Sequence, residues 1–287
     1  MVCGSRGCLS DCLKPAERLA FSVLHLKFHS LSHLSRSPMR KTALLLALIA
    51  ASNLHADTLG ELKARLATLV ATDTVSASVA VERTRLRDGK PDPTLPPASI
   101  TINVEAGSDG FSMQIPSATL KAVSQETLNA DPEAKKPLTA ALEQISSRDL
   151  NNYLDAAPKL LNALANATVK SETTDTFNGA PTRLLTLELK PALSKQDAKY
   201  IKELDASAKI WLNAAGDPVA AEQALSMKGR AMLVISFEQE NKERYSFLRV
   251  GDRLIVTEHH SHSEGSGAGE NGGSDVRAKI SLNELGG

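Results

Sequence analysis

Cysteine is nearly absent from the chain, and the position of the few cysteines decides what their scarcity means. The 287 residues include three cysteines, Cys3, Cys8 and Cys12, which all lie near the start. The rest of the chain can form no disulfide and contains no cysteine nucleophile or thiol for lipid attachment. A hydrophobic core has to stabilise the fold, and the chain is long enough to build one. The three cysteines themselves lack the paired C-x2-C spacing of zinc modules.

Other signatures are missing as well. Residues 57–287 contain neither a G-x-S-x-G nucleophile elbow nor an H-E-x-x-H helix. Dense blocks of Lys and Arg are absent, and 26 basic and 31 acidic residues remain once residues 1–56 are set aside. Nucleic-acid binding depends on clustered cations, so the composition argues against a nucleic-acid partner. We therefore expect a protein that is not an enzyme, needs no cofactor and binds no nucleic acid.

The apolar run after residue 41 is too short for a membrane span, which needs about 20 residues. It follows Arg40 and Lys41 and leads to a small residue, Ala56. Two cations, a short apolar run and a small residue at the exit are typical of a Sec-type secretory signal. We interpret residues 39–56 as a signal peptide cleaved after Ala56, and residues 1–38 as an upstream extension that is not part of the native protein.

Residues 57–287 are thus predicted to form a soluble periplasmic protein without stable membrane insertion. Thr58 and Glu61 form a capping box, and leucines at helical spacing predict a first helix over residues 57–71. Further helices are expected within residues 131–165, where Pro158 should break or bend the chain, and a short one over residues 194–204. Alternating segments separated by Gly-containing turns predict roughly ten or eleven strands. Their ranges are 75–87, 100–105, 111–115, 168–176, 183–189, 209–213, 219–227, 231–238, 245–250, 253–264 and 276–282.

These elements predict a single α+β domain over residues 57–287. The short connections favour an antiparallel meander sheet, curved as a half-barrel and covered by helices. A flexible Ser/Gly-rich loop is expected near residues 261–275. Two arrangements remain open: a sheet packed solidly on its helices, or a half-barrel whose helices close a hydrophobic cavity.

Several segments carry a resemblance to a known family. They are residues 148–161, 167–170, 178–181, 208–212 and 216–220, within the order of a first helix, strands, a central helical insertion and a long meander. This pattern resembles the periplasmic lipoprotein-carrier (LolA-like) superfamily over most of residues 57–283. The resemblance implies a half-barrel closed by helices that holds acyl chains.

One window holds all three histidines of residues 57–287. If it is a strand, Glu258, His260, His262 and Glu264 share one face and His259 points to the other. Two imidazoles at i and i+2 with flanking carboxylates are suitable ligands for Zn²⁺, Cu²⁺ or Ni²⁺. The predicted metal ligands are Glu258, His260 and His262, and the alternative is a solvated strand end.

Three functional hypotheses follow. The first is a non-catalytic binding protein for a lipid or other hydrophobic ligand, with Trp211, Leu185, Leu187 and Phe237 in the cavity wall. The second is an interaction scaffold with a filled core that binds an envelope protein. The third is a metal-binding module that uses residues 259–262. A cavity between sheet and helices favours the first hypothesis, and a filled interior favours the second.

Overall fold

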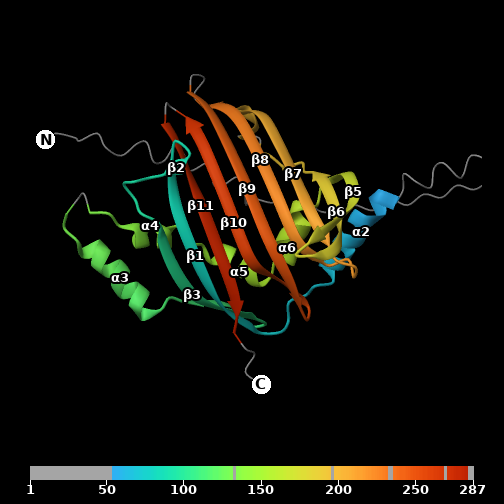
Figure 1. Ribbon diagram of the computed structural model, residues 1–287, viewed down its shortest axis with the longest axis horizontal. Helices are drawn as coiled ribbons and strands as arrows, with labels where there is room; N and C mark the ends of the chain where they lie inside the picture. The colour runs from blue at the N-terminus through green and yellow to red at the C-terminus, as the bar shows by residue number, and fades with distance from the viewer. Residues whose placement is uncertain (1–53, 132–133, 195–196, 232–234, 268–269, 284–287) are drawn as a thin grey trace, which may run out of the picture.

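The structure is a computed structural model that describes residues 54–131, 134–194, 197–231, 235–267 and 270–283. The predicted upstream extension, 1–38, and most of the predicted signal peptide, 39–56, lie outside the described residues. The described chain combines helices with one large antiparallel sheet (Figure 1). The predicted α+β class is therefore confirmed.

The sheet has eleven strands in the order β4-β3-β1-β11-β10-β9-β8-β7-β6-β5, with β2 paired to β1. Strands β5 to β11 form a meander, as predicted, and β1 extends it by pairing antiparallel with β11. The sheet is open because its edge strands, β4 and β5, do not pair. The bounds are β1 Val75–Arg87, β2 Lys90–Pro91, β3 Ala98–Gly107, β4 Gly110–Gln114, β5 Thr168–Phe177, β6 Ala180–Glu188, β7 Ile201–Leu212, β8 Pro218–Ala231, β9 Ile235–Val250, β10 Arg253–Gly267 and β11 Glu270–Leu282.

Helices α2, α4, α5 and α6 lie on one face of this sheet, which we call the covered face; the other is the open face. Helix α3 packs against α4. Figure 1 shows α5 and α6 behind the long strands. The break predicted at Pro158 is present as the gap between these two helices, and Pro158 lies in the first turn of α6. No helix in the described residues is both long and apolar enough to cross a membrane. The bounds are α2 Leu54–Ala67, α3 Ser117–Leu128, α4 Pro137–Glu143, α5 Ser147–Leu154 and α6 Ala157–Ala163, with a short 3₁₀ turn, η1, at Asp197–Lys199.

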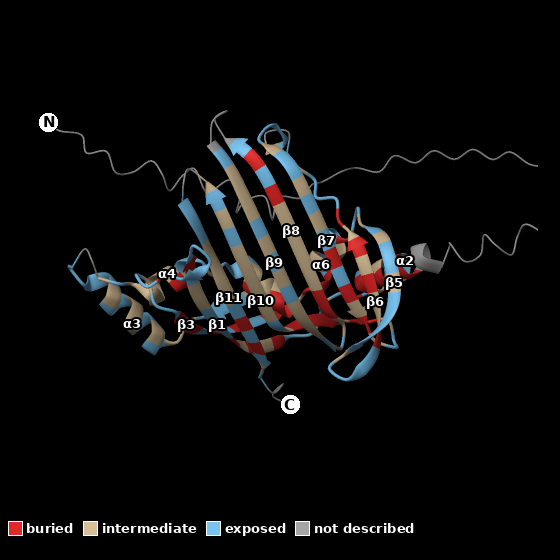
Figure 2. Cartoon of the chain, turned by 45° about the horizontal axis from the view of Figure 1, so that its top comes forward, coloured by how far each residue is buried: buried red, intermediate tan, exposed pale blue. Residues whose placement is uncertain are grey.

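The hydrophobic core lies between the helices and the covered face. Strand alternation sends every second side chain into it, as in β3, where buried and exposed residues alternate. Figure 2 shows that buried residues gather where the sheet lies against α5 and α6. The largest fully buried side chains are Leu62, Leu66, Ile100, Ile102, Leu150, Leu154, Leu164, Leu185, Leu187, Ile210, Leu212 and Leu254.

Three details differ from the sequence-based expectations. Residues 261–267 and 270–275, for which we predicted a flexible loop, belong to β10 and β11, and residues 268–269 lie outside the described part. Glycine is needed at one position in these strands, because a Cβ on Gly273 would lie 2.1 Å from the Ser263 carbonyl oxygen. The helix predicted over 194–204 is only η1, followed at once by β7. Residues 235–238 and 245–250, from two predicted strands, belong to one strand, β9, while Ala231 ends β8 and residues 232–234 lie outside the described part.

Candidate functional site

A groove of about 680 Å³ crosses the open face. On four adjacent strands its lining residues are consecutive triplets, namely 220–222 on β8, 244–246 on β9, 258–260 on β10 and 277–279 on β11. In each triplet the middle residue faces the helices, so its backbone forms the floor, while its two neighbours flank the groove. The groove also reaches Ser99 on β3 and Phe177 on β5. It therefore runs across the strands rather than along them.

One end of the groove is aromatic. The indole Nε1 of Trp211 donates a hydrogen bond of 2.7 Å to Oδ2 of Asp175. The Trp211 ring lies 6.3 Å from the ring of Phe177, centroid to centroid. The hydrogen bond from Trp211, together with one from the backbone N–H of Thr176, lowers the pKa of Asp175. The charged carboxylate thus fixes the indole orientation at the groove end.

A row of charged side chains forms one side of the groove. Strand register places Glu222, Arg244, His260, Arg277 and Glu82 opposite one another on β8, β9, β10, β11 and β1. Arg244 forms an ion pair with Glu222, with Nε 2.9 Å from the carboxylate. The other side is formed by Ala220, Ser246, Glu258, Lys279 and Ala80, which are also paired in register. The groove is therefore polar, with both charge signs along it.

The predicted site residues fall into separate places. Trp211, Glu258 and His260 all line the groove, although no sequence pattern groups the tryptophan with the histidines. Leu185 and Leu187 lie in the core on the opposite face. They do not meet Trp211, which points to the open face.

Phe237 lies far from the other predicted cavity residues. It pairs with Gly229 and Gly267 near the outer ends of the long strands. Its ring occupies the space where a Cβ on Gly229 would lie. The four predicted cavity residues therefore do not surround one space in the structure.

Residues 258–264 form part of a strand, as predicted, but the carboxylate that contacts both His260 and His262 is Asp275 and not Glu258. Nε2 of His260 lies 2.7 Å from Oδ2 of Asp275, and Nδ1 of His262 lies 3.4 Å from the same oxygen. Glu258 instead pairs in register with Lys279 and Ser246. As the side chains stand, no group of three or more His, Cys, Asp or Glu residues within the described ranges is arranged to hold a metal ion.

A polar cluster lies directly beneath the groove floor, on the covered face. We call it the interface cluster; it consists of Tyr153 on α5, Lys159 on α6, Glu243 and Tyr245 on β9, and His259 on β10. The Tyr153 hydroxyl is 2.8 Å from Nδ1 of His259, and the His259 ring stacks on Tyr245 at 4.5 Å. Lys159 donates to the Tyr245 hydroxyl at 3.0 Å, and that hydroxyl donates to Glu243. These bonds connect both helices to the central strands.

Burial sets the protonation states in this cluster. Desolvation lowers the pKa of His259 to about 4, against an opposing attraction from Glu243. Nε2 of His259 is buried without a hydrogen-bond partner in the structure. Desolvation also raises the pKa of Tyr153 and of Tyr245. At neutral pH the imidazole and both phenols are therefore uncharged.

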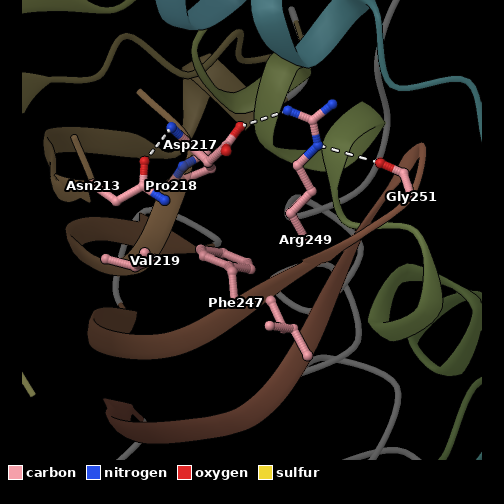
Figure 3. A pocket seen from close by; sticks show the side chains of 8 residues that line it. Asn213, Asp217, Pro218, Val219, Phe247, Arg249 and Gly251 are labelled. Atoms are coloured by element: carbon pink, nitrogen blue, oxygen red, sulfur yellow. Dashed lines mark hydrogen bonds and ion pairs between the residues drawn. The ribbon is translucent and has the colours of Figure 1, made fainter. Parts of the chain in front are cut away.

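A second pocket, of about 420 Å³, lies where β7 turns into β8 and β9 turns into β10. Figure 3 shows the Arg249 side chain reaching the Asp217 carboxylate on one side and the Gly251 carbonyl on the other. Nε of Arg65, on α2, donates to the same Asp217 oxygen at 2.5 Å. Asp217 thus links α2 to both hairpins.

Asp175, Phe177, Asp275 and the partners of His259 in the interface cluster were not predicted from the sequence. Asp275 is separated from His262 by the β10–β11 hairpin, and only the strand register places the two opposite each other. Asp175 and Phe177 follow the alternation of β5 and have no distinctive local sequence. The one available signal was alternation, which predicts the face of a side chain but not its partner on another strand.

Comparison with known proteins gives only distant similarities. No model of a known protein family matches the chain, and no curated protein matches it. Among solved structures, the chain is similar to a DUF1329 family protein from Desulfovibrio piger, with 14% identity, 81% of this chain and 94% of that chain covered, and a TM-score of 0.32. It is also similar to MucB in complex with MucA(peri), with 9% identity, 79% and 94% coverage, and a TM-score of 0.18. The function therefore has to be inferred from the site itself.

Proposed function

We propose that the chain is an exported, non-catalytic binding protein that binds a partner polypeptide of the cell envelope through the groove on its open face. The observation that carries the proposal is the groove lining, with an aromatic pair at one end and charges of both signs along its sides. We place the protein in the periplasm on the basis of its signal-like segment, and we infer a LolA-like sheet as its framework.

The dimensions of the groove suit an extended segment. From β3 to β5 the sheet order gives eight steps between neighbouring strands. At about 4.8 Å per step this is a path of roughly 38 Å along the sheet. An extended polypeptide of about eleven residues has that length, since each residue adds about 3.4 Å. Such a segment also supplies backbone hydrogen bonds and charges of both signs.

The lining disfavours an acyl chain as the groove ligand. An acyl chain laid along the groove would desolvate Glu258, Lys279 and Glu82 without offering them a hydrogen bond, which is costly. On the covered face, Leu185 and Leu187 are at most 1% exposed and pack within the core. Neither of the two pockets described above lies among these core leucines. These observations support the interaction hypothesis over the lipid hypothesis.

Photo-crosslinking from one side of the groove tests the proposal. A photoreactive residue replaces Ser246, which lines the groove, or Ser207, which is an exposed serine on β7 outside it. In cells of the source organism we expect Ser246, but not Ser207, to give a discrete adduct with a polypeptide. The mass of the adduct identifies the class of ligand.

Three outcomes contradict the proposal. These are equal adducts from both positions, no adduct from Ser246, and an adduct with the mass of a lipid. Native mass spectrometry of the protein purified from the periplasm, with lipid extraction, provides the complementary measurement. Co-purified acyl species would favour the lipid hypothesis.

A further inference from the structure

His260, His262 and Asp275 form a compact cluster on the open face, beside the groove. His260 and His262 are two residues apart on β10, so both side chains point to the open face. Asp275 is directly opposite His262 on β11. Both imidazoles direct a nitrogen to one oxygen, Oδ2 of Asp275, at 2.7 and 3.4 Å. Three potential ligands of a metal ion thus lie close together, and a rotation of their side chains is needed before they surround an ion.

We propose that His260 Nε2, His262 Nδ1 and Asp275 Oδ2 form a three-ligand site for Zn²⁺, with water in the fourth position. Nitrogen and carboxylate ligands lie about 2.0–2.2 Å from zinc, so two of them are separated by roughly 3.3–3.5 Å around a tetrahedral ion. The distance of 3.4 Å between His262 and Asp275 already fits. The distance of 2.7 Å between His260 and Asp275 has to lengthen by roughly 0.6–0.8 Å, which requires a rotation of one of the two side chains.

The surroundings of the cluster match those of a zinc site. The other ring nitrogen of His262, Nε2, lies 3.4 Å from the Glu264 carboxylate. Such a carboxylate fixes the tautomer and ring orientation of a metal-bound histidine.

Neighbouring cations do not prevent metal binding, because each has an acidic partner. Lys242 pairs with Glu240 at 3.5 Å, and Arg244 pairs with Glu222 at 2.9 Å. Arg277 contacts the other oxygen of Asp275, Oδ1, at 3.4 Å, which leaves Oδ2 for the metal. Arg277 and the proposed metal ion thus contact different oxygens of the Asp275 carboxylate.

This site differs from the metal hypothesis based on sequence in one ligand. The sequence pointed to Glu258 because it is two residues before His260 on the same face. The structure gives Asp275, on the neighbouring strand, as the carboxylate in contact with both imidazoles. The two hypotheses therefore predict different effects on Zn²⁺ affinity when Glu258 or Asp275 is replaced.

Isothermal titration calorimetry with Zn²⁺ tests the site on residues 57–287, prepared without a polyhistidine tag. We expect one ion per chain. Asp275→Asn and His262→Ala should each weaken binding by about tenfold or more, since each removes a ligand. Glu258→Gln is the matched control and should change the affinity by less than about twofold. Co²⁺ added in place of Zn²⁺ should give visible absorption bands of a tetrahedral site in the wild type.

The proposal is overturned if the wild type binds no Zn²⁺, or if Glu258→Gln weakens binding as much as Asp275→Asn. It is also overturned if His262→Ala binds as well as the wild type. Circular dichroism of each variant checks that it is folded, and His262→Ala provides a second test if Asp275→Asn is not. No partner polypeptide is needed, so the outcome is independent of the proposed groove function.

Discussion

His259 is the side chain that most directly connects the helices to the floor of the groove. Its neighbours in sequence, Glu258 and His260, line the groove, while its own ring lies on the covered face between Tyr153 and Tyr245. A buried polar group costs free energy unless it is hydrogen-bonded, and Nδ1 has one partner, the Tyr153 hydroxyl. The orientation of His259 therefore depends on α5.

Removal of that hydroxyl should destabilise the protein. In Tyr153→Phe the ring still fills its space, but Nδ1 of His259 loses its partner, and we expect the free energy of unfolding to fall by about 1–3 kcal/mol. Urea unfolding measures the change. Tyr200→Phe is the control, because Tyr200 is 44% exposed, and it should shift the value by less than about 0.5 kcal/mol. Equal effects of the two substitutions would contradict the role assigned to Tyr153.

At the scale of elements, one carboxylate attaches the first helix to the sheet. Partial burial raises the pKa of Asp217, but the hydrogen bonds from Arg65 and Arg249 exceed this effect, and the net pKa is lowered from 3.8. A carboxylate whose pKa is lower in the folded state than in the unfolded state stabilises the fold. This stabilisation is fully present above the pKa of the unfolded state and is lost as the pH falls through the pKa of the folded state. The attachment of α2 to the hairpins should therefore weaken in acid.

Comparison of the wild type with Asp217→Asn at several pH values tests this link. The variant cannot ionise at this position, so it should be less stable than the wild type by a constant amount from about pH 5 to 7. The difference should shrink below about pH 4, as Asp217 of the wild type takes up a proton. Urea unfolding at each pH provides the values. A difference that grows toward low pH would contradict the sign of this argument.

The β10–β11 hairpin depends on glycine for a steric reason. A Cβ on Gly273 would lie 2.1 Å from the carbonyl oxygen of Ser263, a backbone atom that cannot move without separating the strands. We expect Gly273→Ala to destabilise the protein by about 1–3 kcal/mol in urea unfolding.

Gly60 on α2 provides the matched control for this substitution. A Cβ there meets nothing within 4 Å, so Gly60→Ala should instead stabilise the helix by about 0.5–1 kcal/mol. If Gly273→Ala were as well tolerated as Gly60→Ala, the two strands would not be as close as the structure places them.

Across the whole molecule, the sequence predicted the turns and strands far better than the contacts between distant elements. The turns at Asp88-Gly89 and Asn178-Gly179 were predictable because both residues of each pair adopt positive φ, which Asn, Asp and Gly tolerate best. Helix α3 was not predicted because it has no buried residue and therefore no apolar stripe. The loop predicted near residues 261–275 differed from the structure because glycine and serine are typical of loops and also of closely packed strands.

The candidate site was the least predictable part, since it is assembled from register. Trp211 and Glu258 are on different strands, and the groove joins them only because β8 and β9 lie between β7 and β10. Hydrophobic periodicity identified the face of each side chain, but pairing between strands depends on the complete sheet. The same limit explains why Leu185, Leu187 and Trp211 were assigned to one cavity although they lie on two faces.

The two faces of the sheet should respond differently to truncation of a side chain. Leu187 is 1% exposed within the core, so Leu187→Ala leaves a cavity and should lower the free energy of unfolding by about 2–5 kcal/mol. Trp211 is only partly buried on the open face, so Trp211→Ala should cost less stability than Leu187→Ala and should abolish the polypeptide adduct from Ser246. Urea unfolding and photo-crosslinking of both variants give the comparison. A sheet that held acyl chains on its covered face would give the reverse result, in which Leu187→Ala is tolerated and changes the co-purified lipid while Trp211→Ala leaves binding unchanged.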